Sequence, residues 1–402
     1  MAVQTTANLT NSQRVQYLEK YAEGAKQERL YDMFAMAPPG MPMGELQHGS
    51  SVSIPFVSEM SPGTDTVSET DDIIPQTRRD ATVSITPTSR GEALQWSLQN
   101  QIQAYTDFVP SCYKTLGMNQ MESVDLLAQA AVLQGNLRFG AARSVLDAGT
   151  TADNLSYAVF ETVATVLEEL RCPAIINSEN GSKSWMAAMR GEPYYDVRIA
   201  NPVLDVGKYQ KGEIILQNEL GKLGSFKIVR SAFAKVFGAA GAANGTPVST
   251  TVNGDAKALD KTFVTAADVS ANIAKGRVWL VGPAAETGNT FQPTNEIIRP
   301  SSAVTTTITF TGQGANGGFR FDHPTGHVVK NADSVYPVAF GSPYSLYKIW
   351  SGELGEYGRV TDKIVGLADQ FISLAWYWIG NYGRVSESWI ARAEVSSSLD
   401  NV

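Results

Sequence analysis

The sequence predicts an α+β fold into which a small all-β domain is inserted. Three observations support this fold class. Apolar residues recur at helical spacing through much of the region before residue 173. Short runs on either side of that region alternate between apolar and polar residues, as strands do. The stretch 239–334 is rich in Thr and Gly and in such alternating runs. At 402 residues the chain is long enough for two or three domains.

The helices are predicted from apolar spacing and from the residues that end them. After a polar arm at residues 1–13, a helix is predicted over Ser12–Ala37, because two prolines follow that cannot continue it. A second helix is predicted over Met121–Phe139. A third is expected to begin with Asp153 as its N-cap and to carry an apolar stripe as far as Leu170.

The strands are predicted from alternation and from short apolar runs. Ser51–Val57 and Ala81–Pro87 alternate and are interpreted as a strand pair. Ser184–Met189 is interpreted as a short helix. Phe371–Ile379 fits a strand or a helix, and its aromatic centre Trp376-Tyr377-Trp378 is expected to be core on both faces. Other predicted strands are Phe226–Val229, Val278–Val281, Val304–Phe310 and Tyr336–Phe340.

The segment between the first two strands, residues 58–80, is too long for a tight turn and too polar for a core. Loops of this length inside a compact domain are usually functional or disordered. Acidic residues precede the basic ones, so two copies of the chain can pair these ends across an interface. The acidic cluster lacks the ligand spacing of a calcium loop. The predicted subunit-contact residues are Glu59, Asp65, Glu69, Asp71, Asp72, Arg78 and Arg79.

Charge and composition exclude several classes of protein. The net charge is −8 and no basic stripe is present, which argues against a dedicated nucleic-acid binder. The N-terminus lacks the features of a signal peptide, and the most apolar stretch, Ile364–Ile379, is too short to span a membrane. Cys112 and Cys172 are distant in sequence and suit a reducing compartment, so a disulfide between them is not expected.

The sequence contains motif-like strings, but none has the context that a catalytic or cofactor site requires. His323 and His327 are four residues apart, but Pro324 and Gly326 exclude a helix and no further ligands complete a metal site, so both are expected in a surface loop. The string from Gly312 to Gly317 spells GxGxxG without a following helix and is interpreted as a loop tip. The sequence therefore predicts no enzyme activity, no metal and no cofactor.

The order of these elements resembles the major coat proteins of schitovirus-like tailed bacteriophages, which have the Hong Kong 97 phage capsid fold. The resemblance covers roughly residues 15–238 and 335–395. None of the matching strings is a catalytic signature, and their order carries the argument. The most specific strings are Leu126–Asp147, Asn154–Tyr157, Leu223–Ser231, Ala234–Gly241, Tyr336–Gly341 and Ser388–Glu394.

The resemblance implies a domain organisation. Residues 1–47 are the N-terminal arm and helix, 48–95 an extended β-hairpin loop that lies over a neighbouring subunit, and 96–238 the peripheral domain with its long helix and the first part of the axial domain. Residues 239–334 are the inserted all-β domain, and 335–402 complete the axial and peripheral domains. Some relatives cross-link subunits through a loop lysine, but this chain has no lysine between Lys26 and Lys114, so a noncovalent shell is expected.

The resemblance also implies a function. The chain is expected to self-assemble into hexamers and pentamers of an icosahedral head around double-stranded DNA, after synthesis in the host cytoplasm. Its expected partners are further copies of itself, a portal, decoration or scaffolding proteins, and packaged DNA through weak contacts. The alternatives are an encapsulin-like compartment shell, a virion glycan-binding protein that uses the Thr/Gly-rich module, and a hydrolase with an unrecognised site.

Overall fold

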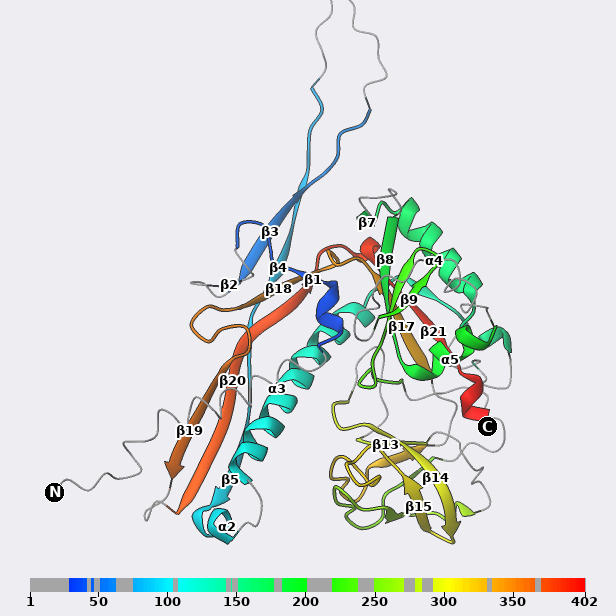
Figure 1. Ribbon diagram of the computed structural model, residues 1–402. Coiled ribbons are helices and arrows are strands. Elements are labelled where there is room, and N and C mark those ends of the chain that lie inside the picture. Colours follow the sequence, from blue (N-terminus) through cyan, green and yellow to red (C-terminus); the bar gives the residue numbers. More distant parts are fainter. Residues whose placement is uncertain are drawn as a thin grey trace, which may run out of the picture. The chain divides into compact units, whose positions relative to one another are not determined.

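The chain folds into two compact units, shown as a ribbon in Figure 1. Unit 1 comprises Met1–Gln27, Ala35–Ser123 and Leu346–Val385, and unit 2 comprises Glu28–Phe34, Val124–Ser345 and Ser386–Val402. Both contain helices and strands, which confirms the α+β class. The computed structural model describes residues 29–41, 45–46, 51–62, 75–103, 108–141, 146, 151–176, 183–200, 219–237, 249–270, 279–283, 292–330, 335–365 and 370–401.

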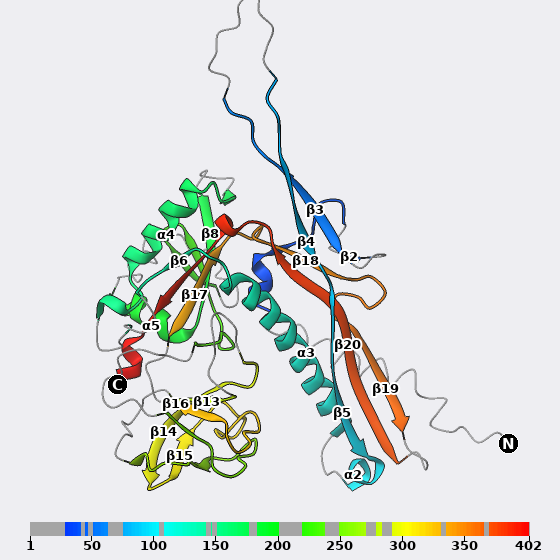
Figure 2. The ribbon, with the colours of Figure 1, turned by 180° about the vertical axis from the view of Figure 1, so that it is seen from behind.

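Six of the described strands of unit 1 form a sheet around the long strand β20 (Phe371–Arg384). Strands β19 (Arg359–Val365) and β5 (Thr88–Ser97) flank its first half, and β18 (Leu346–Ser351) pairs with its second half. Two short strands, β1 (Ala35–Met36) and β2 (Glu45–Leu46), pair in parallel with β18. Helix α2 (Leu98–Gln103) follows β5 directly, and Figures 1 and 2 show α3 (Phe108–Leu133) running alongside this sheet.

One face of β20 forms the core of unit 1. Leu374, Trp376 and Trp378 are at most 2% exposed, and the Trp376 indole donates a hydrogen bond to Asn119 Oδ1 of α3 at 2.8 Å. The intervening Tyr377 is 45% exposed, so the prediction of core on both faces was wrong. Alternation with aromatic residues is what a strand with one covered face requires, and it resolves the ambiguity of this run in favour of a strand.

Helix α3 is longer at its start and shorter at its end than the predicted Met121–Phe139. It begins at Phe108, and Pro110 lies within its first turn. A proline is tolerated there, because backbone N–H groups in the first turn have no partner within the helix. It ends at Leu133, because Arg138–Phe139 form strand β6 beside β21 (Ile390–Val395). Tertiary pairing therefore removed the last turn and a half from the predicted helix.

The helix predicted over Ser12–Ala37 is wrong at its C-terminal end, and residues 12–28 lie outside the described residues. Tyr31–Phe34 form a 3-10 helix, η2, and Ala35–Met36 form β1. The side chains of Tyr31 and Phe34 are fully buried, and the Tyr31 amide donates to Asp125 Oδ1 at 2.9 Å. These tertiary partners replace the backbone bonds that a continued helix would have made.

The main sheet of unit 2 places its described strands in the order β6, β21, β17 (Tyr336–Gly341), β8 (Lys183–Met189), β10 (Phe226–Arg230) and β9 (Glu219–Leu223), and β7 (Ile175–Ile176) also pairs with β8. Helices α4 (Tyr157–Glu169) and α5 (Gly191–Ala200) belong to the same unit. The rings of Phe160, Phe226 and Phe340 meet edge to face with centroids 5.1–5.8 Å apart. The strands predicted at Phe226–Val229 and Tyr336–Phe340 are confirmed.

The short helix predicted at Ser184–Met189 is wrong, because these residues form strand β8. It pairs in parallel with β10 on one side and antiparallel with β17 on the other. Most of its residues are buried on both faces, with the pattern of a central strand. The Ala and Met residues that suggested a helix have only weak local preferences, which the two neighbouring strands override.

The third predicted helix, α4, is present, but Asp153 is not its N-cap. Asp153 ends a 3-10 helix, η5 (Thr151–Asp153), and Ser156 occupies the N-cap position without a side-chain capping bond. The predicted stripe of Leu155, Val159, Val163, Val166 and Leu170 is confirmed only in part, since Leu155 and Val163 are at most 1% exposed but Leu170 is 40% exposed. Phe160 and Leu167, which the prediction did not include, complete the buried face.

Between residues 249 and 330, the described residues of unit 2 form a second, all-antiparallel sheet, hereafter the β module. Its order is β11 (Ser249–Thr251), β16 (Val328–Lys330), β13 (Trp279–Gly282), β14 (Glu296–Val304), β15 (Thr307–Thr311) and β12 (Thr262–Val264). The core of the module contains Trp279 and a cluster of phenylalanines. The strand predicted at Val278–Val281 is confirmed as β13, and the one predicted at Val304–Phe310 is confirmed only from Thr307 on, as β15, because Val304 ends β14 and a turn follows it. The domain boundaries at 239 and 334 stay predictions.

Two further features follow from the described residues. Cys112 and Cys172 are both free thiols, and they belong to different units. Among the helices in the described ranges, none combines the length and apolar character that a membrane crossing demands.

Candidate subunit-contact site

The predicted strand pair is confirmed as a two-stranded antiparallel ribbon, hereafter the long hairpin, which unit 1 contributes. Strand β3 (Val52–Val57) pairs with β4 (Asp80–Ile85) in the register Val52↔Ile85 to Val57↔Asp80. Among the described strands, no third strand pairs with either of them. Figures 1 and 2 show the two strands side by side as a twisted ribbon.

Only the base of the long hairpin is anchored by burial. Ile54 and Ile85 are 8% and 3% exposed, and their side chains share one face of the ribbon with Val52 and Val83. Ile85 lies against β20, where a Cβ on Gly383 would come within 2.4 Å of Ile85 Cγ1. The burial that holds the hairpin is therefore confined to its lower end.

Above the base, hydrogen bonds continue between the arms without any core. Ser58 N donates to the Arg79 carbonyl at 2.7 Å, and Arg79 N donates to Ser58 Oγ at 2.9 Å. Gln76 and Ser61 then bond through a backbone amide and a side-chain amide. Every described residue of 57–62 and 75–82 is exposed. A two-stranded ribbon without a packed face is at best marginally stable in water.

Three of the seven predicted contact residues lie in the described part of this hairpin. Glu59, Arg78 and Arg79 are all exposed, and Arg78 Nε donates to the Ser58 carbonyl at 3.4 Å. The sequence predicted acidic and basic residues at separate ends of the loop. Because Ser58 pairs with Arg79, Glu59 instead lies on the arm opposite Arg78 and Arg79. The remaining four, Asp65, Glu69, Asp71 and Asp72, lie outside the described residues.

The sequence reading missed two apolar residues on the hairpin. Val57 is 51% exposed and Met60 is 58% exposed, beyond the last buried residue of the strand. Exposed apolar side chains on an unpaired ribbon are typical of a surface that another chain covers. The available signal was Met60 itself, an apolar residue among the polar residues that follow Val57.

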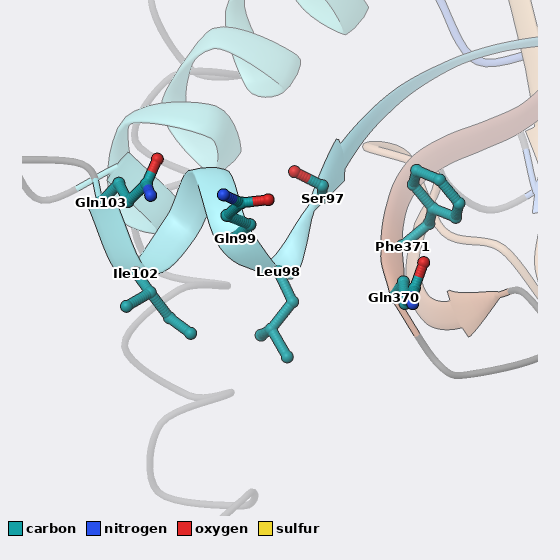
Figure 3. Close-up of a pocket in the computed structure, with 7 residues that line it drawn as sticks. All are labelled: Ser97, Leu98, Gln99, Ile102, Gln103, Gln370 and Phe371. Atoms are coloured by element: carbon teal, nitrogen blue, oxygen red, sulfur yellow. The ribbon is translucent and has the colours of Figure 1, made fainter.

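A second exposed apolar surface of unit 1 lies around helix α2, and we call it the α2 pocket. It is an open pocket of about 400 Å³ in which Leu98, Ile102 and Phe371 are 44%, 75% and 43% exposed. Figure 3 shows Leu98 and Ile102 projecting side by side from α2, with Phe371 entering from β20. The polar part of its lining consists of Ser97, Gln99, Gln103 and Gln370. The sequence analysis did not predict this surface, because one turn with two apolar residues does not by itself indicate an exposed contact surface.

The prediction that His323 and His327 both lie in a surface loop was wrong for His323. The side chain of His323 is fully buried, and its Nε2 lies 3.1 Å from Glu296 Oε1. Its Nδ1 lies 3.0 Å from His327 Nδ1. In the described part of the chain, no group of three or more His, Cys, Asp or Glu side chains is arranged to hold a metal ion. The GxGxxG string is confirmed as a loop, closed by a bond from Gly312 N to the Gly317 carbonyl at 2.8 Å.

Four large aromatic residues of the β module lie in its interior. Trp279 and Phe319 are fully buried, and Phe263 and Phe310 are at most 4% exposed. Their rings pack against one another, with the Phe310 and Phe319 centroids 4.3 Å apart. These rings serve as core, and a glycan platform would need aromatic faces on the surface.

Comparison with known proteins gives likenesses of structure only. No family model and no curated protein matches the sequence. Among solved structures, the capsid of Ralstonia phage GP4 is 9% identical with a TM-score of 0.49, over 92% of this chain and 89% of that one. The capsid of cyanophage P-SCSP1u is 10% identical with a TM-score of 0.48, over 87% and 84%. The capsid of cyanophage Pam1 is 9% identical with a TM-score of 0.48, over 88% and 86%.

Proposed function

We propose that this chain is a major capsid protein of a tailed bacteriophage, with a fold of the Hong Kong 97 type. Copies of it join as hexamers and pentamers into the icosahedral head that encloses the phage DNA. The protein works as a structural component of the virion and not as an enzyme. The observation that carries the proposal is the long hairpin, whose described residues beyond the base are exposed and pair with no third described strand.

The balance between conformational entropy and burial in the hairpin supports this role. Its distal part has ordered backbone and bonds between its arms, but it buries no described side chain beyond Ile54 and Ile85. Ordering each residue costs roughly 1–2 kcal/mol of conformational entropy, which burial normally offsets. A hairpin that offers backbone edges and the exposed side chains of Val57 and Met60 gains that burial when a second copy packs against it.

The α2 pocket supports a second contact between copies. Leu98, Ile102 and Phe371 together expose an apolar surface at one end of unit 1. A shell subunit needs heterologous contacts on several sides, because a single self-complementary patch closes after two copies. Two separate apolar surfaces on one unit meet that requirement.

Other expected partners follow from the proposal. A shell of this kind incorporates a portal, and decoration or scaffolding proteins can accompany assembly. The net charge of −8 fits weak, non-specific contact with DNA at the inner surface, since no basic stripe holds phosphates. The β module is proposed to lie on the outer surface, where inserted loops are tolerated.

Electron microscopy of the purified full-length chain tests the proposal. We expect closed shells, rings or sheets of regular subunits. Deletion of residues 60–75 should leave a folded protein that no longer assembles, because the deletion removes the distal part of the hairpin that a neighbouring copy is proposed to contact. Normal shells formed by the deletion variant would refute the role of the hairpin, and a wild-type chain that stays monomeric under all salt and protein concentrations would refute the function.

Point variants separate loss of contact from loss of folding. Met60→Asp places a charge on the exposed part of the hairpin and should reduce assembly while leaving the thermal unfolding temperature unchanged. Val304→Asp is the matched control, because Val304 is 73% exposed in the β module and belongs to a different unit from the hairpin. Equal effects of the two variants on assembly would contradict a specific role for the hairpin.

A further inference from the structure

A chain of three titratable side chains runs through the β module, and the proposed function does not use it. Glu296 of β14 is 1% exposed and His323 is fully buried. The Nε2 atom of His323 lies 3.1 Å from Glu296 Oε1. Its other ring nitrogen lies 3.0 Å from Nδ1 of His327, which is partly exposed. The three side chains therefore lead from the buried carboxylate towards the surface.

The hydrogen-bond partners of Glu296 determine where the protons lie. The carboxylate accepts the backbone N–H groups of Arg320 and Phe321, so it acts as an ionised acceptor. His323 must then donate its Nε2 proton to Glu296, which leaves its Nδ1 as a lone pair. His327 donates its Nδ1 proton to that lone pair. In this arrangement every polar atom between the three side chains is satisfied.

The other charged groups around the pair are accounted for by their own contacts. Asp322 accepts the amide of Ala258 at 2.7 Å, and Asp255 accepts the amide of Thr325 at 3.3 Å. The Arg320 guanidinium lies over the rings of Phe233 and Phe321. The ring of Phe319 packs against His323 with centroids 4.7 Å apart. Glu296 is therefore the carboxylate that directly contacts the histidine pair.

The pair can hold one extra proton but not two. A proton added to the outer nitrogen of His327 leaves the Nδ1–Nδ1 bond intact. A second proton must go to Nδ1 of His323, where it would face the N–H of His327 at a separation of 3.0 Å. Two donors at that distance repel, and both rings then carry a positive charge in a partly buried setting. The second protonation therefore requires the two rings to separate.

We propose that the Glu296–His323–His327 chain is an acid-sensitive latch on the turn His323–His327. At neutral pH the latch keeps the turn packed against Val252 and Ala256. Two backbone hydrogen bonds join His323 and Ala256 at 2.8 and 2.9 Å, and Gly326 N donates to the Val252 carbonyl at 2.9 Å. Double protonation drives the imidazoles apart and releases the turn.

The direction of the pH effect follows from the folded state. Burial, followed by the charge of His323, lowers the pKa of His327 below its ordinary value of 6.5. A base whose pKa is lowered by folding contributes stability in full above the unfolded pKa and loses it as pH falls through the folded pKa. The turn is therefore closed at pH 7 and opens on the acid side of pH 6.5. Because the singly protonated latch takes up one further proton when it opens, the opening equilibrium of that form shifts by up to about tenfold per pH unit.

Exchange of the imidazole C2 hydrogen, followed by mass spectrometry across a pH series, measures each histidine in the intact full-length protein, whether assembled or not. The chain has only three histidines, and His48 serves as the reference in another part of the sequence. We expect the midpoint of His327 to lie below 6.5. A midpoint of His327 at or above 6.5 would overturn the proposal.

Amide exchange tests the release of the turn itself. Peptides covering 320–328 should lose protection by up to about tenfold per pH unit below pH 6.5, after correction for intrinsic exchange, while peptides from β17 and β21 stay unchanged. His327→Asn should abolish this dependence, and His48→Asn should leave it intact. Protection of the turn that is independent of pH down to 5, or that falls equally in His327→Asn, would contradict the latch. If His327→Asn does not fold, the wild-type midpoints alone decide.

Discussion

At the scale of single residues, the most consequential group is a buried carboxylate, that of Glu394 in β21. It is fully buried and lies 3.0 Å from the Nε atoms of both Arg138 and Arg392. Arg392 in turn donates to the carbonyls of Leu133 and Gly135 at the end of α3. One carboxylate thus holds the arginine that satisfies the last carbonyls of the helix, which would otherwise lack partners.

Glu394→Ala should destabilise the protein by about 3–5 kcal/mol, because it leaves two arginines beside an empty buried site. Glu168→Ala is the matched control, since its ion pair with Lys183 is more than half exposed on both sides. An exposed pair of this kind contributes about 0–1 kcal/mol. Urea unfolding of both variants measures the difference, and similar losses would contradict the assigned importance of Glu394.

The two cysteines should differ in reactivity. Burial raises the pKa of Cys172 to about 12, and burial also raises the pKa of the partly exposed Cys112. Only the thiolate reacts, so at pH 8 about one Cys172 in ten thousand is reactive. Iodoacetamide should therefore modify Cys112 first in the native protein and both equally in urea. Peptide mass spectrometry over time gives the two rates, and faster modification of Cys172 would be inconsistent with its burial.

At the scale of elements, sequence patterns predicted what local chemistry determines. The alternation of Val52, Ile54 and Phe56 correctly predicted β3, and apolar spacing correctly predicted that α4 is a helix. The patterns failed where a distant partner decides the structure. The residues Met186 to Met189 favour a helix locally, but they form a strand between β10 and β17. Arg138 was predicted in a helix, but it pairs with β21 as part of β6. No local signal identifies those partners.

The anchoring of the hairpin gives a prediction at the same scale. Gly383→Ala should displace Ile85, because the new Cβ would lie 2.4 Å from its Cγ1, and overpacking of this kind costs about 1–3 kcal/mol. Gly191→Ala is the control, because an added Cβ there meets only Arg230 Cδ at 3.6 Å. Amide exchange over residues 80–86 should rise in the first variant alone. Unchanged exchange in Gly383→Ala would show that Ile85 does not anchor the hairpin.

At the scale of the whole molecule, the sequence predicts that residues 58–80 need an outside partner, which stays a prediction, and it does not indicate which surface meets them. Length and polarity argue against a self-contained loop, and the structure adds that Glu59, Arg78 and Arg79 are exposed on a ribbon. The surfaces that copies use for contact depend on exposure, as at Met60 and Ile102, and exposure exists only after folding. The buried position of His323 was unpredictable for the same reason.

Amide exchange of the long hairpin, compared between assembled particles and dissociated subunits, tests the central claim most directly. The account predicts that residues 52–62 and 75–85 exchange rapidly in the free subunit beyond the buried base, and become strongly protected in the particle. Equal exchange of the distal hairpin in the two states, or full protection already in the free subunit, would contradict it.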